Sequence, residues 1–320
     1  MAKKIVVIND WYGEDLKAEM RKAAEKAGFD IAFYETQEEA ADAVADAEVI
    51  YGFPNRILSG AASLKWLCLP TAGADAFCKE GVLGEDVILT NASGAYGVTL
   101  AEFAVMVTLM LLRRQKLYDD TMRERIWHGQ VPQRTLCGSR VTLLGAGDIG
   151  QCYARRIRPF EPAIITAVNR SGRTDADCFD EVYPQSALKE ILPRTDILVM
   201  SLPSTPETIR ILNKELIDLL PDDAYVVNVG RGTAIDEPAL IEALNAGRLA
   251  GAALDVMHEE PLPADDPLWE AKNILLTPHI AGNLTTEHTR RVNVAMFLED
   301  LDNYANGREL RYRVNRRLGY

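Results

Sequence analysis

The sequence predicts an α/β protein with two doubly wound parallel sheets, each in a domain of its own. Three observations carry this prediction. Short apolar segments with the length of buried strands alternate with helical segments along nearly the whole chain. A glycine-rich turn, Gly145-Ala-Gly-Asp-Ile-Gly150, follows one apolar segment directly and opens a helix. The length of 320 residues is sufficient for two domains with separate cores.

The first part of the chain is predicted to form a small α/β unit that ends near Asn91. Its expected strands are 4–8, 31–34, 49–51, 66–69 and 87–90. The segment 14–27 has helical periodicity and ends at Gly28, as a C-terminal glycine would end it. An alanine-rich helix is expected at 38–47. Alternating strands and helices of this kind imply a parallel sheet.

A long helix is predicted at 100–125, and it leads to a second α/β unit. The strands expected in that unit are 141–144, 164–168, 197–201, 225–229, 251–254 and 274–276. Helices between them are centred near Ala154, Leu188, Leu216 and Leu240, and a last helix is expected at 287–306. This strand count is typical of a doubly wound dinucleotide-binding sheet.

Composition excludes several classes of protein. Hydrophobic residues make up 48% and charged residues 26% of the chain, which is an ordinary balance for a globular protein. The net charge of −12 argues against a nucleic-acid partner. The basic segment 308–317 is the exception, and we interpret it as a solvated or subunit-contacting surface.

Cysteine usage and apolar runs bear on location. The five cysteines form no Cys-x-x-Cys pair and no metal-binding spacing, so we expect no metal site and a reducing cytoplasm. The N-terminus leads directly into a strand, which favours the absence of a signal peptide. The longest apolar run, 103–112, is too short to span a bilayer, so no membrane partner is expected.

The glycine-rich turn predicts a dinucleotide site. Gly145 permits the tight strand-to-helix turn, Gly147 lets a pyrophosphate approach the backbone, and Gly150 allows the helix to pack closely on the strand. The helix N-terminus, with Asp148 and Ile149, then offers N–H groups to the phosphates. An ordinary turn is the alternative, but the surrounding strand and helix favour the dinucleotide.

The residues after the strand 164–168 predict which dinucleotide is bound. NAD-binding sites usually carry an acidic residue here, which accepts a hydrogen bond from the ribose. This chain has Asn169 instead, followed by Arg170, Ser171 and Arg173. Arginines pair with a 2′-phosphate by charge-assisted hydrogen bonds. The loop therefore favours NADP(H) and leaves NAD(H) open, the alternative being that both arginines are solvated loop residues.

Three further strand ends carry residues suited to catalysis. Arg231 lies between two glycines after 225–229, Asp255 and then Glu260 follow 251–254, and His279 follows 274–276. Any one of these could be structural, for example a capping histidine or a solvated loop acid. Because they share one edge of a sheet with a nicotinamide site, a catalytic set is the favoured interpretation.

These residues resemble the D-isomer-specific 2-hydroxyacid dehydrogenase family over nearly the whole chain. The motifs that carry the resemblance are Gly145-Ala-Gly-Asp-Ile-Gly150, Leu202-Pro-Ser-Thr-Pro-Glu-Thr208, Asn228-Val-Gly-Arg-Gly232, Leu254-Asp-Val-Met-His-Glu-Glu-Pro261 and Thr277-Pro-His-Ile-Ala-Gly282. The resemblance implies a Rossmann-type cofactor domain at 100–285. It also implies a discontinuous flavodoxin-like substrate domain formed by 1–99 and 286–320, and a homodimer with the helix 100–112 at its interface.

The resemblance also implies a role for each site residue. His279 matches the general acid/base, Glu260 its carboxylate partner and Arg231 the substrate-binding arginine. The backbone N–H groups of Ala72 and Gly73 match the loop that holds the substrate carboxylate. The remaining cofactor contacts that the resemblance implies are Leu202, Pro203, Thr208, Val229, Gly230, Asp255 and Gly282, together with Arg231 and His279.

The implied reaction is hydride transfer between NADP(H) and a small 2-keto or 2-hydroxy acid, in the reductive direction. Glyoxylate, hydroxypyruvate and larger 2-keto acids all remain open as substrates. Protonated His279 would donate to the carbonyl oxygen, and Glu260 would favour the charged imidazole. The alternative class is a nucleotide-sensing corepressor of the same fold, but such proteins tend to carry long flanking segments that this chain is expected to lack.

Overall fold

The structure is a computed structural model that describes residues 3–319. The chain divides into two compact units. The first consists of Met1–Tyr96 and Asn283–Tyr320, and the second of Gly97–Gly282.

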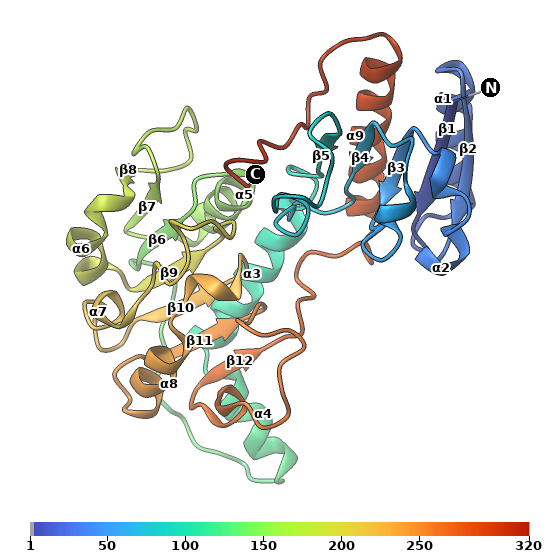
Figure 1. Ribbon diagram of the computed structural model, residues 1–320. Helices are drawn as coiled ribbons and strands as arrows, with labels where there is room; N and C mark the ends of the chain where they lie inside the picture. The colour runs from blue at the N-terminus through green and yellow to red at the C-terminus, as the bar shows by residue number, and fades with distance from the viewer. Residues whose placement is uncertain (1–2, 320) are drawn as a thin grey trace. The chain divides into compact units, whose positions relative to one another are not determined.

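The first unit is built on a parallel sheet of five strands (Figure 1). The strands are β1 (Lys3–Ile8), β2 (Phe29–Tyr34), β3 (Val49–Gly52), β4 (Trp66–Cys68) and β5 (Ile88–Thr90). Their order is β2-β1-β3-β4-β5, which is the flavodoxin-like order. The expected strands of this unit are therefore confirmed, along with the doubly wound parallel fold.

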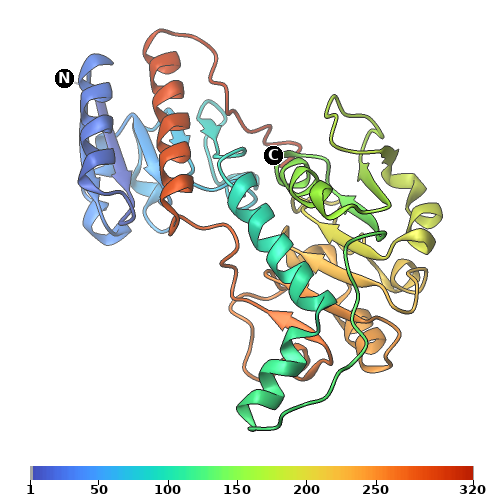
Figure 2. The ribbon, with the colours of Figure 1, turned by 180° about the vertical axis from the view of Figure 1, so that it is seen from behind.

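Helices from both ends of the chain cover this sheet. They are α1 (Glu14–Lys26), α2 (Gln37–Ala40) and α9 (Glu287–Ala305). Helices α1 and α9 pack side by side (Figure 2). Phe297 of α9 stacks on Tyr51 and Trp66 of the sheet, with ring centroids 4.3 and 5.6 Å apart. The C-terminal helix is thus part of the core of the first unit.

The basic C-terminal segment also belongs to the first unit. Arg313 pairs with Thr90 in an antiparallel bridge, and the N–H of Val314 donates to Leu89 O at 2.9 Å. Arg316 donates to the carbonyls of Leu83, Gly84 and Glu85. The segment therefore covers the exposed edge of β5, which is a structural role.

The second unit is built on a parallel sheet of seven strands in the order β12-β11-β10-β9-β6-β7-β8. They are β6 (Arg140–Leu144), β7 (Ile164–Asn169), β8 (Glu181–Pro184), β9 (Ile197–Met200), β10 (Tyr225–Asn228), β11 (Gly251–Leu254) and β12 (Ile274–Leu276). This is the Rossmann order with one strand added at the β12 edge. The edge strand β8 was not expected, because its four residues are only half-buried and show no apolar run.

Six helices accompany this sheet. They are α3 (Gly97–Leu112), α4 (Gln115–Arg123), α5 (Asp148–Ile157), α6 (Leu188–Ile191), α7 (Lys214–Ile217) and α8 (Glu237–Asn245). The prediction of a single helix at 100–125 is wrong. The helix ends at Leu112, and Arg114 adopts a left-handed conformation with φ of 56°. The break coincides with the change from an almost wholly apolar sequence to a polar one.

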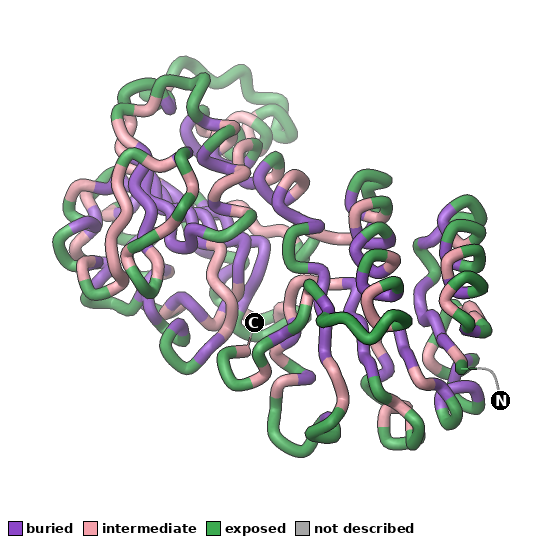
Figure 3. Tube along the Cα trace, turned by 90° about the horizontal axis from the view of Figure 1, so that it is seen from above, coloured by how far each residue is buried: buried purple, intermediate pink, exposed green. Residues whose placement is uncertain are grey.

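The inner strands of both sheets are buried, as Figure 3 shows in purple, whereas the edge strands β2 and β8 are mostly half-buried. Strands buried on both faces read as continuous apolar runs, which is why the sequence located most of them. Over residues 3–319, no helix is both long and apolar enough to cross a membrane.

Candidate active site

The glycine-rich turn lies between β6 and α5. Gly145 has φ of 117°, and a Cβ there would lie 2.8 Å from Ser201 Oγ. A Cβ on Gly150 would lie 2.1 Å from Gly145 O, so the helix could not start so close to the strand. Around Gly147, by contrast, the described residues leave open space within 4 Å of an added Cβ. The turn thus has a tight base and an open backbone at Gly147, as close approach of a phosphate requires.

Asp148 is the first residue of α5, and its carboxylate is folded back on the start of α3. It accepts the N–H of Gly97, where any Cβ would lie 2.2 Å from the carboxylate. Loss of surrounding water raises the pKa of Asp148, and the hydrogen bonds from Gly97 and from the Cys152 thiol oppose this rise. Asp148 therefore joins the glycine-rich turn to the first residue of the second unit.

Asn169 organises the loop that follows β7. Its Oδ1 accepts the N–H of Gly172 at 2.7 Å, and its Nδ2 donates to Arg173 O at 2.8 Å. Gly172 has φ of 68°, and a Cβ there would lie 2.7 Å from Pro184, so the turn requires glycine. Arg170, Ser171 and Arg173 are exposed on this loop. The asparagine thus shapes a turn that presents two arginine side chains.

The loops after β9 and β10 are held internally. The hydroxyl of Thr208 donates to Pro203 O at 2.7 Å and accepts the N–H of Thr205 at 2.8 Å. A Cβ on Gly230 would lie 2.6 Å from Leu202 N, so the two loops touch through backbone alone. Thr208 therefore fixes the loop 203–208, while Val229 and Gly230 are buried and Gly230 lies beside Leu202.

Arg231 follows the end of β10. Asn228 accepts the N–H of Gly230 at 3.0 Å and donates to Arg231 O at 2.9 Å, which fixes the backbone on both sides of the arginine. The guanidinium donates to Gly230 O at 2.9 Å, and the residue remains partly exposed. Sequence reasoning missed Asn228 as a site residue, although an asparagine at a strand end before two glycines is a typical turn signal.

Asp255 holds the turn that carries His279. It is 2% exposed, and its carboxylate accepts from Thr277 Oγ1 at 2.7 Å and from the N–H groups of Ile280 and Ala281 at 2.9 and 3.0 Å. Its carbonyl accepts the N–H of His279 at 2.8 Å. The four donors all belong to residues 277–281, so Asp255 fixes the turn on both sides of the histidine.

His279 and Glu260 form a direct pair. His279 Nδ1 lies 2.7 Å from Glu260 Oε2, and both side chains are partly exposed at 47% and 34%. Glu260 Oε1 accepts the N–H of Met257 at 3.0 Å. The carboxylate therefore binds one ring nitrogen and leaves Nε2, on the far side of the ring, for a reacting group.

A second carboxylate supports the loop that carries Glu260. Glu237, at the start of α8, accepts the N–H of His258 at 2.6 Å. Burial raises the pKa of Glu237. Gly232 packs under the same loop, where a Cβ would lie 1.9 Å from the Met257 backbone. Sequence reasoning missed Glu237, because nothing in a helix-starting glutamate signals a partner 21 residues away.

Ala72 and Gly73 lie in the first unit, on the loop that follows β4. Both are partly exposed. The hydroxyl of Thr71 donates to Gly73 O at 3.0 Å, so this threonine acts within the loop. Asn91 Nδ2 donates to Ala72 O at 2.6 Å.

Comparison with known proteins agrees with this geometry. Residues 105–281 match the family described as D-isomer specific 2-hydroxyacid dehydrogenase, NAD binding domain. An uncharacterised protein from the proB 3′ region of Corynebacterium melassecola is 34% identical over 81% of this chain and 84% of its own length. Glyoxylate/hydroxypyruvate reductase A of Salmonella heidelberg is 34% identical, over 58% of this chain and 59% of its own length.

Solved structures match the whole chain. A D-isomer specific 2-hydroxyacid dehydrogenase family protein from Aeromonas salmonicida superposes with a TM-score of 0.88 at 30% identity, over 99% of this chain and 100% of its own. A D-isomer specific 2-hydroxyacid dehydrogenase from Xanthobacter autotrophicus, in complex with NADPH and MES, gives 0.84 at 28% identity over 100% of both chains. The chain therefore belongs to the D-isomer specific 2-hydroxyacid dehydrogenase family and is an oxidoreductase that acts on CH–OH groups.

Proposed function

We propose that this enzyme reduces small 2-keto acids to D-2-hydroxy acids with NADPH as the hydride donor. The observation that carries the proposal is the His279–Glu260 pair, 2.7 Å apart and partly open to solvent. The pair lies at the edge of the second sheet where the strands have their carboxyl ends. The glycine-rich turn after β6 lies at the same edge, and ligands of doubly wound sheets bind there.

The chemistry of the reduction follows from the charge that it creates. A hydride added to the carbonyl carbon leaves negative charge on the carbonyl oxygen. His279 donates a proton from Nε2 to that oxygen, and the alcohol and a neutral imidazole result. Glu260 on Nδ1 fixes the ring orientation and stabilises the imidazolium before transfer. Arg231 binds the carboxylate and carbonyl of the substrate and so orients the carbon for attack.

The residues present fit a dinucleotide. Gly147 leaves its backbone open on the side that a pyrophosphate would approach, and the N-terminal N–H groups of α5 suit an anion. When bound, the nicotinamide supplies the hydride. Arg170 and Arg173 would pair with a 2′-phosphate, and Asn169 introduces no acid to repel it. The NADPH in the Xanthobacter structure supports the same choice, with NAD(H) as the weaker cofactor.

We propose that the N–H groups of Ala72 and Gly73 hold the substrate carboxylate and that His279 and Arg231 contact the carbonyl. The reductase name of the Salmonella relative supports glyoxylate or hydroxypyruvate as the substrate and reduction as the direction. A nucleotide-sensing corepressor is the alternative, but such a role would not require the paired histidine and glutamate.

We also propose a homodimer in the cytoplasm. Helix α3 is apolar nearly all round, yet Met106 on it remains 48% exposed. The segment that follows exposes Met122, Ile126 and Trp127, the last at 90%. A second copy of the chain would cover these side chains by two-fold symmetry. The cysteine pattern of the sequence favours a reducing compartment.

A panel of 2-keto acids with NADPH tests the function. Glyoxylate, hydroxypyruvate, pyruvate and a branched 2-keto acid are each followed by loss of NADPH absorbance, with NADH in parallel. We expect turnover with at least one small keto acid and a higher kcat/KM for NADPH than for NADH. Absence of turnover with every keto acid would contradict the proposal.

A further inference from the structure

In the first unit, three successive carbonyls of the loop after β4 are held by hydrogen bonds. Pro70 O accepts from Asn293 Nδ2 at 2.8 Å and from the Tyr96 hydroxyl. Thr71 O accepts the N–H of Ala92 at 2.9 Å. Ala72 O accepts Asn91 Nδ2 at 2.6 Å. The donors come from α9 and from the chain that follows β5, so the loop is fixed from two directions.

These bonds decide where the amide N–H groups of the loop point. The only cis peptide bond among the described residues is Glu260-Pro261, so the peptides of the loop are trans. A trans peptide directs its N–H opposite to its C=O. With the carbonyls of residues 70–72 bound to donors within the unit, the N–H groups of Thr71, Ala72 and Gly73 are directed away from those donors. Within residues 3–319, none of the three N–H groups donates a hydrogen bond.

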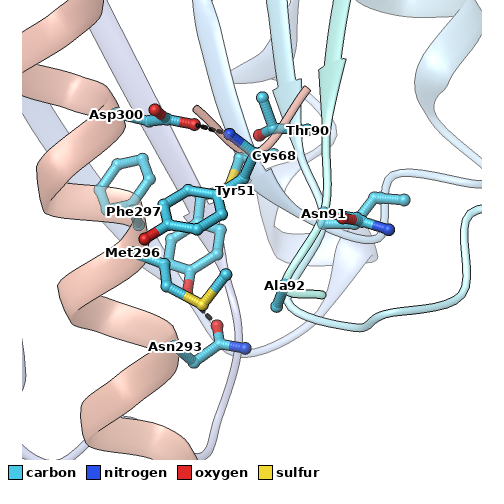
Figure 4. Close-up of a pocket in the computed structure, with 11 residues that line it drawn as sticks. Tyr51, Cys68, Thr90, Asn91, Ala92, Asn293, Met296, Phe297 and Asp300 are labelled. Atoms are coloured by element: carbon cyan, nitrogen blue, oxygen red, sulfur yellow. Dashed lines mark hydrogen bonds between the residues drawn. The ribbon is translucent and has the colours of Figure 1, made fainter. Parts of the chain in front are cut away.

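The surroundings of Asn293 orient its side-chain amide as a donor to Pro70 O. It is 1% exposed, and its Oδ1 accepts from the hydroxyls of Tyr12 and Tyr51. Burial raises the pKa of both tyrosines well above the usual value, so the hydroxyls stay neutral and can donate. Since a backbone carbonyl only accepts, the amide nitrogen of Asn293 must face Pro70 O. Figure 4 shows Asn293 on α9 beside Tyr51, at a small cavity that Asn91 also lines.

Asn91 is held in turn by the C-terminal segment. Its N–H donates to Tyr312 O at 3.1 Å, and its Oδ1 accepts the N–H of Ser93 at 3.3 Å. Asp300 of α9, 1% exposed, accepts the N–H groups of Arg311 and Tyr312 at 2.7 and 3.2 Å. Helix α9 thus supports the loop twice, directly through Asn293 and through the segment that positions Asn91.

We propose that Asn91 and Asn293 are positioning residues for carboxylate recognition, because they keep the N–H groups of Ala72 and Gly73 aimed outward as an anion-binding concavity. The inference rests on the proposed function, which assigns the substrate carboxylate to these two amides. Successive N–H groups directed to one side form such concavities in many anion sites. Asn91 matters most, because it binds the carbonyl of the very peptide that carries the Gly73 N–H.

The test compares a charged substrate with its uncharged ester. In Asn91→Ala, the Ala72–Gly73 peptide loses the donor that fixes it. The kcat/KM for glyoxylate should fall roughly 10- to 100-fold, the range for a hydrogen bond to a charged group. The loss should lie mainly in KM, the kcat/KM for methyl glyoxylate should change less than about threefold, and the Kd for NADPH should stay the same. A general structural defect would instead lower the kcat/KM for glyoxylate and for methyl glyoxylate equally, and that result would overturn the proposal.

Two further variants keep the test decisive. Asn91→Ser retains a short acceptor for the Ser93 amide but is too short to reach Ala72, and it should show the same acid-to-ester change if the alanine variant does not fold. Tyr304→Phe, which removes a hydrogen bond from α9 to Glu48 at 3.0 Å, is the matched control and should leave the ratio unchanged. Equal ratios in wild type and Asn91→Ser would count against Asn91.

The loop can also be tested apart from turnover. If the wild-type enzyme reduces no 2-keto acid, the proposed function fails, and amide resonances then examine the loop alone. Oxamate, a small carboxylate, should shift the Ala72 and Gly73 amide protons in the wild type and do so much less in Asn91→Ser. Oxamate shifts that are the same in both proteins, or absent from both, would overturn the inference.

Discussion

At the scale of single residues, two carboxylates hold His279 in different ways. Glu260 binds the ring at Nδ1, and Asp255 binds the backbone of the turn on both sides of it. His279 has φ of 53°, a conformation that residues other than glycine seldom adopt. Three hydrogen bonds to the Asp255 carboxylate and one to its carbonyl offset this strain. The ring is thus held in place before any substrate binds.

Replacing Glu260 tests the pair directly. In Glu260→Gln, the protonated ring loses a negative charge 2.7 Å away while the shape of the partner side chain is kept, so proton donation to the carbonyl oxygen should weaken. The kcat for keto-acid reduction should therefore fall, while the Kd for NADPH remains unchanged. His279→Ala should lose the proton donor altogether and fall by about 10²–10⁴ in kcat. Measurement of kcat, kcat/KM and the NADPH Kd for both variants checks these effects.

The neighbouring Glu259 is the control for this experiment. Its side chain is exposed on the same loop, and Glu259→Gln should leave kcat as it is in the wild type. If Glu260→Gln left kcat unchanged while Glu259→Gln lowered it, the assigned pairing would be wrong.

Cofactor choice is also predicted to depend on single side chains. Arg170→Ala should weaken NADPH by about 1.5–3 kcal/mol, the value of a lost charged hydrogen bond, and should change NADH little. Arg158→Ala, which removes an ion pair to Asp180 near the start of β7, is the control and should affect neither cofactor selectively. Fluorescence titration of the wild type and both variants with each cofactor gives the six dissociation constants. An equal loss for NADPH and NADH would contradict the phosphate assignment.

Sequence reasoning could name the residues at the strand ends but not how they are held. His279, Glu260 and Arg231 stand out because each follows a buried strand of one sheet. Asp255 stands out for the same reason, yet only the structure shows that its oxygens are occupied by the 277–281 turn. Asn293 carries no such signal, because it lies 223 residues from the carbonyl that it binds. Contacts across that distance depend on the fold of the whole unit.

At the scale of elements, α8 stabilises the loop that carries Glu260 through a hydrogen bond to Glu237. Burial raises the pKa of this carboxyl, so the native state keeps its proton to higher pH than the unfolded chain does. The contribution of Glu237 to the free energy of unfolding is therefore fully present below the pKa of the unfolded chain. It is lost as pH rises through the higher pKa of the folded state.

Glu237→Gln removes this titration but keeps an acceptor for the His258 amide. The Tm of the wild type minus that of the variant should therefore decrease as pH rises from about 4, the unfolded value for a glutamate, toward neutrality. Thermal unfolding of both proteins at several pH values measures it. A Tm difference independent of pH would show that Glu237 does not titrate as expected.

The helix after the first unit shows where periodicity fails as a guide. Apolar residues continue to Leu112 and then give way to Arg113 and Arg114, and a single helix was predicted through both parts. The chain instead breaks there and starts α4 at Gln115. The C-terminal segment was similarly ambiguous, because a run of arginines does not reveal that its backbone pairs with β5. Backbone pairing leaves no mark in composition.

At the scale of the whole molecule, both sheets keep the strand orders of doubly wound folds. Right-handed crossovers between parallel strands limit the possible strand orders, and the alternating elements in the sequence predicted the doubly wound class. Within residues 3–319, several large apolar side chains in one segment of the chain nevertheless remain exposed. Met106, Met122, Ile126 and Trp127 are all about half exposed or more, and all lie between residues 106 and 127.

Exposure of this kind predicts association. A charge introduced at Met106, on the outward face of α3, would have to be buried in a two-fold interface, and an unpaired buried charge is strongly unfavourable. Light scattering at micromolar concentration should therefore give a dimer for the wild type and a monomer for Met106→Lys. Phe160→Lys is the matched control, because Phe160 is 41% exposed but lies outside this segment, and it should remain dimeric. A monomeric wild type would rule out the dimer, and loss of the dimer in Phe160→Lys alone would place the interface elsewhere.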